Sequence, residues 1–399
     1  MSEKNQAIPG IPEKSFAGTI TPVILSVFSV YLTVGMTLGT LPAYVKNELQ
    51  CSALVVGIVA GLQSLATLLT RAYAGKLTDT KGAKTSKHAG LALILLSGLI
   101  YIGASMIDTY ILPALCLIIL ARIVHGISES LAVTGALTWG IGLVGPQKSG
   151  KVMTWNGIAM YAGIAVGAPL AITMKSTLGI SYVFATIILL PVLSWVVTYR
   201  LANLPVDTGH VRTPFYKVIG LIAPQGLGLA FASIGFACIS SFIALLFSQQ
   251  HWGNPSMAFM TFGAFYILTR VFFSSLPDRF GGYRVALVSL AVEVAGQLLI
   301  FTASSPAVVI LGCSLTGIGF SLIFPALGVL AIKKVAPQMR GTALGAYAAF
   351  FDLALGLAGP AAGIIAGWYS YQAVYVFGAV SGLLAAFILF LNSKKTSQS

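Results

Sequence analysis

The chain has 399 residues, of which 57% are hydrophobic and only 8% are charged. Soluble domains carry about 25% charged residues, so this composition excludes a water-soluble globular protein. Because one membrane-spanning helix needs about 20 apolar residues, this length accommodates twelve spans with loops and tails. In a soluble protein the formal net charge of +13 would suggest nucleic-acid binding, but no nucleic-acid motif accompanies it.

Polar and Pro/Gly-rich breaks divide the chain into twelve predicted spans. They are Thr19–Val45, Leu54–Gly75, Ser86–Met106, Ile111–Ile141, Val152–Met174, Ile180–Leu201, Tyr216–Phe247, Met257–Leu276, Tyr283–Ala303, Ala307–Ile332, Thr342–Trp368 and Tyr371–Asn392. The sequence therefore predicts an all-α membrane protein with two six-helix bundles. The predicted units are a cytoplasmic N-tail (1–18), an N-terminal bundle (19–201), a cytoplasmic linker (202–215), a C-terminal bundle (216–392) and a cytoplasmic C-tail (393–399).

The basic residues are distributed unequally between the two sides of the predicted membrane. The tails and the loops after every second span carry almost all of them, whereas the opposite side has only Lys46 and Lys175. The positive-inside rule then places both termini in the cytoplasm. We expect the basic loops to contact anionic lipid rather than nucleic acid.

The two halves contain an internal repeat. Arg71 to Gly82 aligns with Arg270 to Gly281, with Arg, Leu, Asp and Gly at matching positions, and Pro146 to Gly150 aligns with Pro337 to Gly341. Two matches in the same order indicate duplicated six-helix bundles, an arrangement described for secondary transporters.

Several motifs resemble those of the major facilitator superfamily (MFS). Gly75 to Lys84 (GKLTDTKGAK) is similar to the family's motif between the second and third spans, and a degraded copy runs from Ser274 to Arg284. Arg122 with Gly126 is similar to the motif of the fourth span. In the fifth span, Gly163 to Pro169 resembles the motif of the drug:proton antiporter branch, although its Pro comes one residue late.

Longer stretches, such as Leu137–Pro146 and Ser321–Gly328, resemble the YfcJ/YhhS-type inner-membrane transporters. The resemblance implies the MFS fold, with two bundles related by a parallel repeat that rock about a central site. It also implies transport of a small molecule.

The repeated motif predicts a gate at the cytoplasmic side. Glycines allow a tight turn, the aspartate can cap the following helix or pair with a basic side chain, and the basic residues can meet lipid phosphate. We expect the two arginines that precede the motif to lie near the cytoplasmic surface, with their side chains reaching it. The predicted gating residues are Gly75, Asp79, Gly82, Lys84, Arg71, Asp278, Arg279 and Arg270.

Ionisable residues at membrane depth predict functional positions because they are costly to bury. Arg122, His125 and Glu129 follow one stripe of the fourth span, and Asp352 lies near the middle of the eleventh. Since Arg122 and Glu129 are about 10 Å apart along the helix, His125 or water would have to bridge them. We expect Asp352 and Glu129 to carry protons, with Arg122 adjusting them. Glu293 in the ninth span is expected to pair locally.

Aromatic and amide side chains in the spans suit the wall of a substrate cavity for an amphipathic organic compound. The predicted set is Trp139, Trp155, Asn156, Tyr161, Tyr266, Tyr347 and Phe351, although each of them alone also fits ordinary packing.

The predicted function is proton-coupled export, driven by the proton gradient without a cofactor or metal, by a chain that acts as a monomer. A proton symporter that imports a sugar or an organic acid, and a membrane sensor or scaffold with a transporter fold, remain as alternatives. The four histidines are dispersed, which argues against an enzyme.

Overall fold

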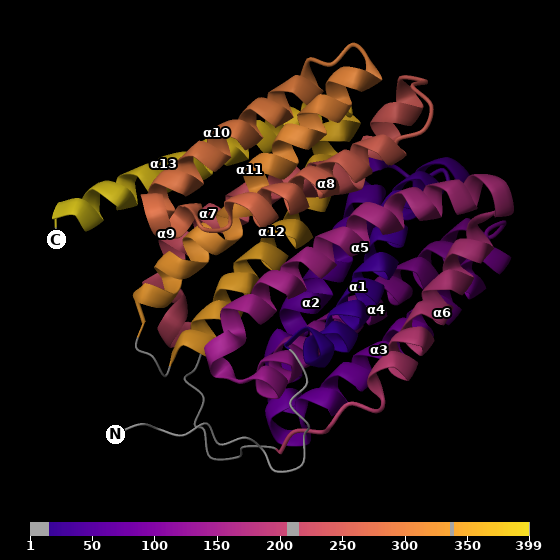
Figure 1. Ribbon diagram of the computed structural model, residues 1–399. Helices are drawn as coiled ribbons and strands as arrows, with labels where there is room; N and C mark the ends of the chain where they lie inside the picture. The colour runs from indigo at the N-terminus through magenta and orange to yellow at the C-terminus, as the bar shows by residue number, and fades with distance from the viewer. Residues whose placement is uncertain (1–15, 206–214, 336–338, 399) are drawn as a thin grey trace, which may run out of the picture.

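The computed structural model describes residues 16–205, 215–335 and 339–398, and it is built from helices in two halves (Figure 1). The N-terminal half contains α1 (Phe16–Ala43), α2 (Ala53–Lys81), α3 (Ala83–Met106), α4 (Ile111–Val144), α5 (Ser149–Leu178) and α6 (Ile180–Thr198). The C-terminal half contains α7 (Phe215–Gln249), α8 (Ser256–Phe273), α9 (Leu276–Phe280), α10 (Gly282–Phe301), α11 (Pro306–Lys333), α12 (Arg340–Trp368) and α13 (Ala373–Gln398). A π-helix (Tyr44–Glu48) extends α1, and a 3₁₀ turn (Pro146–Lys148) precedes α5.

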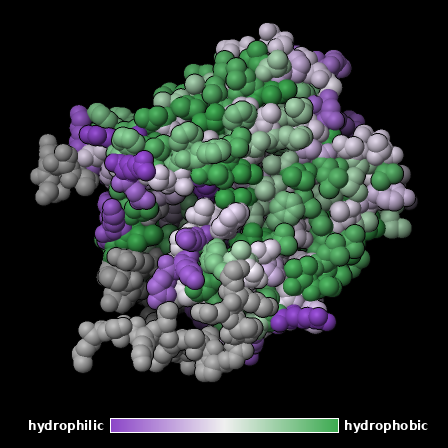
Figure 2. All heavy atoms as spheres, in the orientation of Figure 1, coloured by the Kyte–Doolittle hydropathy of each residue, from purple (hydrophilic) through white to green (hydrophobic). Residues whose placement is uncertain are grey.

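Twelve of the helices in the described residues are long and apolar enough to cross a membrane, which confirms the predicted fold class. Figure 2 shows hydrophobic residues over most of the face drawn, with hydrophilic residues gathered toward its edges. Large apolar side chains such as Leu69, Leu112 and Phe272 are exposed on the outside of the bundle. In a lipid environment this exposure carries no penalty, so the surface fits a multi-pass membrane protein.

One deviation from the predicted spans is at the end of α2. The prediction ended this span at Gly75, but the helix continues to Lys81, and Gly75 is a buried helical residue. A single glycine lowers helix propensity without ending a helix that is packed on its neighbours. The helix ends at Gly82, whose φ of 94° is in a region that residues with a side chain rarely adopt.

The C-terminal half has the same turn. Gly281, with φ of 87°, precedes α10 as Gly82 precedes α3. The short helix α9, which the sequence analysis did not predict, carries Asp278 and Arg279 just before this glycine. Residues 1–15 of the predicted N-tail and 206–214 of the predicted linker lie outside the described part of the chain.

The two halves meet mainly where α2 packs on α12 and α5 packs on α8, and α1 also contacts α7. We call the end of the bundle where α1 begins and α13 ends the terminal end, and the other the opposite end. Toward the opposite end, the backbones of α2 and α12 touch at Gly57 and Gly359, where a Cβ on either glycine would overlap the carbonyl oxygen of the other. Close backbone approach at small residues is typical of helix packing in membranes.

Candidate functional site

A cavity of about 60 Å³ lies between the two halves. Helices α1, α2, α4 and α5 contribute from one side, and α7 and α12 contribute from the other. Its wall mixes rings, aliphatic side chains, hydroxyls and two ionisable groups. The lining residues are Tyr31, Val34, Leu38, Ala60, Gln63, Ser64, Arg122, Glu129, Met160, Tyr161, Ile164, Phe236, Ala237, Ser240, Ser241, Phe351 and Leu355.

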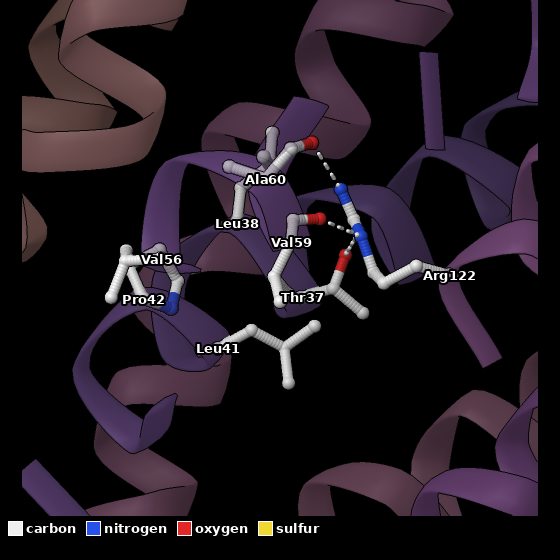
Figure 3. Close-up of a pocket in the computed structure, with 8 residues that line it drawn as sticks. All are labelled: Thr37, Leu38, Leu41, Pro42, Val56, Val59, Ala60 and Arg122. Carbon is white, nitrogen blue, oxygen red and sulfur yellow. Dashed lines mark hydrogen bonds between the residues drawn. The ribbon is translucent and has the colours of Figure 1, made fainter. Parts of the chain in front are cut away.

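Arg122 of α4 stands between this cavity and a smaller one of about 10 Å³ toward the opposite end. Its guanidinium donates to the carbonyl oxygens of Val59 (2.9 Å) and Ala60 (2.8 Å) and to the Thr37 hydroxyl (3.1 Å), as Figure 3 shows. Another bond goes to the side-chain oxygen of Gln63. The charge is therefore held by neutral acceptors on α1 and α2, and only 2% of the residue is exposed.

Gln63 of α2 connects Arg122 to Glu129. The amide oxygen accepts a hydrogen bond from Arg122, and the amide nitrogen donates one of 2.8 Å to the Glu129 carboxylate. The sequence analysis expected His125 or water to bridge the two charges, and that expectation is wrong. The bridge comes from a neighbouring helix, which periodicity along α4 alone could not reveal.

Close packing of α2 on α4 positions this glutamine. A Cβ on Gly126 would overlap the Gln63 carbonyl oxygen, so the glycine of the fourth-span motif allows the approach. The Thr67 hydroxyl lies 3.0 Å from both the Gln63 and the Gly126 carbonyl oxygens and ties the two helices together one turn further along.

His125 lies on another face of α4. Its Nε2 is 3.1 Å from the Thr33 hydroxyl of α1, and its ring packs edge-on against Tyr101. The residue is fully buried, and among the described residues its Nδ1 has no hydrogen-bond partner. The structure therefore separates His125 from the cavity that Arg122 and Glu129 line.

Asp352 of α12 forms an ion pair with Arg71 of α2, across the boundary between the halves. The expected position of Arg71 near the cytoplasmic surface is therefore wrong, because its charge is directed inward to Asp352. The side chains of Arg71 and Asp352 are only 22% and 6% exposed. The pair is close enough to Glu129 for electrostatic interaction, whereas the expected partner Arg122 bonds elsewhere.

Arg270 of α8, the repeat counterpart of Arg71, is also buried rather than at the surface. It donates a 2.8 Å bond to the Ser321 carbonyl oxygen, and its guanidinium lies 5.0 Å from the centre of the Tyr266 ring. Tyr266 stacks in turn on Tyr161 of α5, with ring centres 3.7 Å apart. The paired arginines of the repeat thus face the boundary between the halves from both sides.

Of the seven residues predicted for the cavity wall, Tyr161 and Phe351 line the cavity. Tyr266 lies directly behind Tyr161, and Tyr347 is buried with its hydroxyl bonded to the Phe324 carbonyl oxygen. The other three lie toward the terminal end: Trp139 donates to the Ala202 carbonyl oxygen, Trp155 is exposed, and the Asn156 amide contacts Met160.

The gating motif forms a fixed turn. The nitrogen of Lys84 donates to the carbonyl oxygens of Tyr199 (2.6 Å) and Leu201 (2.7 Å), which holds the end of α6. In the repeat, Asp278 and Arg279 are exposed on α9.

Sequence reasoning missed Gln63, Tyr31 and the serines of α7, because it sought the charged network among ionisable residues and chose other aromatic and amide positions for the cavity wall. The signal available was a lone amide at membrane depth, one helical turn before Thr67. A polar side chain inside a span requires a partner, so Gln63 could have been predicted to meet a charge.

A sequence model of the Major Facilitator Superfamily matches residues 23–219 and 225–399. An uncharacterized MFS-type transporter of Salmonella typhimurium is 39% identical over 385 residues, which cover 96% of this chain and 99% of the relative. In fold, the chain is similar to the crystal structures of a D-xylose-proton symporter (TM-score 0.77, 16% identity, 94% and 97% covered) and the nucleoside transporter NupG (TM-score 0.73, 15% identity, 94% and 99% covered). The chain belongs to the Major Facilitator Superfamily and is a multi-pass membrane transporter.

Proposed function

We propose that this transporter is proton-coupled and exports small amphipathic organic compounds across a bacterial inner membrane, with its terminal end in the cytoplasm. One observation carries the proposal. Glu129, on the cavity wall, is joined through Gln63 to Arg122 and lies beside the Arg71–Asp352 pair that connects the halves. Two carboxylates at membrane depth thus adjoin both the cavity and the boundary that must open.

The ion pair supplies a physical link between a proton and the conformation of the protein. When Asp352 takes up a proton, its charge disappears and its attraction to Arg71 falls. That change weakens the connection between α2 and α12, which belong to different halves. In alternating access, the halves rock about a site near the middle of the membrane, so loosening this connection favours the open state.

The cavity wall indicates the substrate chemistry. The rings of Tyr161, Phe236 and Phe351 offer apolar faces, while Ser240 and Ser241 supply hydroxyls. Such a mixture fits a compound with an aromatic or aliphatic body and a few polar groups. A cavity of about 60 Å³ is smaller than ligand pockets, which span roughly 300–1,000 Å³, so the halves must separate to admit a substrate.

Everted membrane vesicles with an imposed proton gradient test the proposal. Amphipathic cations, organic anions and sugars are screened for dissipation of the gradient by the wild type, Asp352→Asn and Glu129→Gln. Glu48→Gln is a matched control, since Glu48 pairs with Lys175 at the opposite end, away from the cavity. We expect one compound class to dissipate the gradient, and the effect to disappear only in the first two variants.

The other outcomes are informative as well. If a compound moves together with the proton, the protein is a symporter. If ligands bind without flux, it is a sensor with a transporter fold. If both carboxylate variants behave as the wild type, proton coupling through these residues is wrong.

A further inference from the structure

A further buried carboxyl group lies inside the C-terminal half and does not line the cavity. Glu293 of α10 is 1% exposed, and among the described residues its Oε2 has no hydrogen-bond partner. It faces the region where α10 packs on α7, α11 and α13. Glu293 was expected to pair locally, and the ion pairs of the described residues involve other carboxylates.

Gln297, one helical turn further along α10, also has an unsatisfied oxygen. Its amide nitrogen donates to the Gly235 carbonyl oxygen (3.3 Å) and the Thr316 hydroxyl (3.2 Å). Because Thr316 gives its own hydrogen to Gly312 (2.9 Å), it acts as an acceptor there. Rotating the amide would place two acceptors opposite each other, so the Gln297 Oε1 is fixed as a buried acceptor without a donor.

The two side chains converge on one point of α7. A Cβ on Gly235 would lie 2.6 Å from the Glu293 Oε1 and 3.3 Å from the Gln297 side-chain carbon, so the glycine leaves space for both. Residues four apart on a helix are neighbours on the same face. The Gln297 Oε1 itself faces Gly378 of α13, so each of the two side chains keeps one buried oxygen without a donor.

The surroundings give an ionised carboxylate nothing to offset its charge. Among the described residues, Cys238 of α7 and Tyr161 of α5 interact electrostatically with Glu293, and both are neutral when protonated. A buried charge without a partner costs several kcal/mol. A bound proton removes this cost.

We propose that the Glu293 carboxyl binds a proton at neutral pH, which makes a proton-binding site inside the C-terminal half. The site adjoins the transport cavity through one helix, since Gly235 and Cys238 of α7 face it while Phe236 and Ala237 line the cavity. Loss of the proton places a charge against the backbone of α7 and disturbs the cavity wall. The proposal does not depend on the transport direction or on Asp352.

Infrared spectroscopy of the purified protein tests this site, because the carbonyl stretch of a carboxylic acid is distinct from the bands of a carboxylate. We expect a carboxylic-acid band at neutral pH that Glu293→Gln removes and Asp352→Asn retains. A spectrum of Glu293→Gln that keeps every carboxylic-acid band of the wild type would overturn the proposal.

A second measurement follows thermal stability as a function of pH and does not depend on the infrared bands. The folded protein holds a proton that the unfolded chain releases at neutral pH, so raising the pH should lower the melting temperature of the wild type. The control variant Asp108→Asn should show the same slope of melting temperature against pH as the wild type. Glu293→Gln should show a shallower slope. Equal slopes in all three proteins would contradict a bound proton at Glu293.

Discussion

Arg71 of α2 and Asp352 of α12 form an ion pair between the two halves of the transporter, although 281 positions separate them in the chain. The pair lies beside Glu129, so three ionisable groups from both halves share one region. Removing one partner leaves the other charge buried and unpaired. The two single substitutions together should therefore lower the free energy of unfolding by more than the double substitution does.

A double-mutant cycle on this pair tests that relationship. We expect Asp352→Asn and Arg71→Gln each to lower the free energy of unfolding by about 3 kcal/mol, while the double variant loses less than their sum. Proton-coupled flux should be absent in Asp352→Asn and in the double variant, because the titrating group is gone. Thermal melting and vesicle flux measure the two effects, and strictly additive losses of stability would show that the residues are not coupled.

Transport should depend on Gln63 as much as on the two charged residues that it connects. Gln63→Leu removes hydrogen bonds to Arg122 and Glu129, and bonds to charged groups contribute about 1.5–3 kcal/mol each. We expect at least about a tenfold loss of flux at normal protein levels. Gln225→Leu is the matched control, because Gln225 is a buried glutamine bonded to the Tyr283 hydroxyl. Equal flux in the two variants would argue against a functional bridge.

The glycine contact of α2 with α12 should act as a closing surface at the opposite end. Gly359→Leu places a side chain against the Gly57 backbone, so the halves cannot close there. Gly367→Leu on the same helix meets open space and serves as the control. We expect flux to fall strongly in the first variant and to stay near the wild-type level in the second. Flux retained by Gly359→Leu would mean that the two helices need not approach this closely.

The fold could be predicted from the sequence because each span is a continuous apolar run, and the basic residues divide the loops into two classes. The site could be predicted only in part. Periodicity placed Arg122 and Glu129 on one stripe of α4, but their connection through Gln63 depends on how α2 packs on α4.

Arg71 illustrates the same limit. Its position near the end of an apolar run suggested a side chain that reaches the membrane surface, yet a carboxylate from the other half holds it inside. Pairing between segments so distant in the chain is set by the packing of the two bundles. A repeat alignment identifies equivalent positions, but it does not show which charges meet.

The orientation of the protein in the membrane can be tested with a native cysteine. Cys51 lies between the π-helix and α2 at the opposite end, so we expect a membrane-impermeant maleimide to label it in intact spheroplasts. Burial raises the pKa of the Cys51 thiol, while Lys46 lowers it more weakly, so less thiolate is present at neutral pH. Because the thiolate is the reactive form, labelling should accelerate as the pH rises through the alkaline range.

The label should disappear in Cys51→Ala and persist in Cys116→Ala, since Cys116 lies within the span of α4. Labelling that requires permeabilised membranes would place the opposite end in the cytoplasm. That result would reverse the orientation derived from the basic loops, and with it the side from which protons reach Asp352 and Glu129.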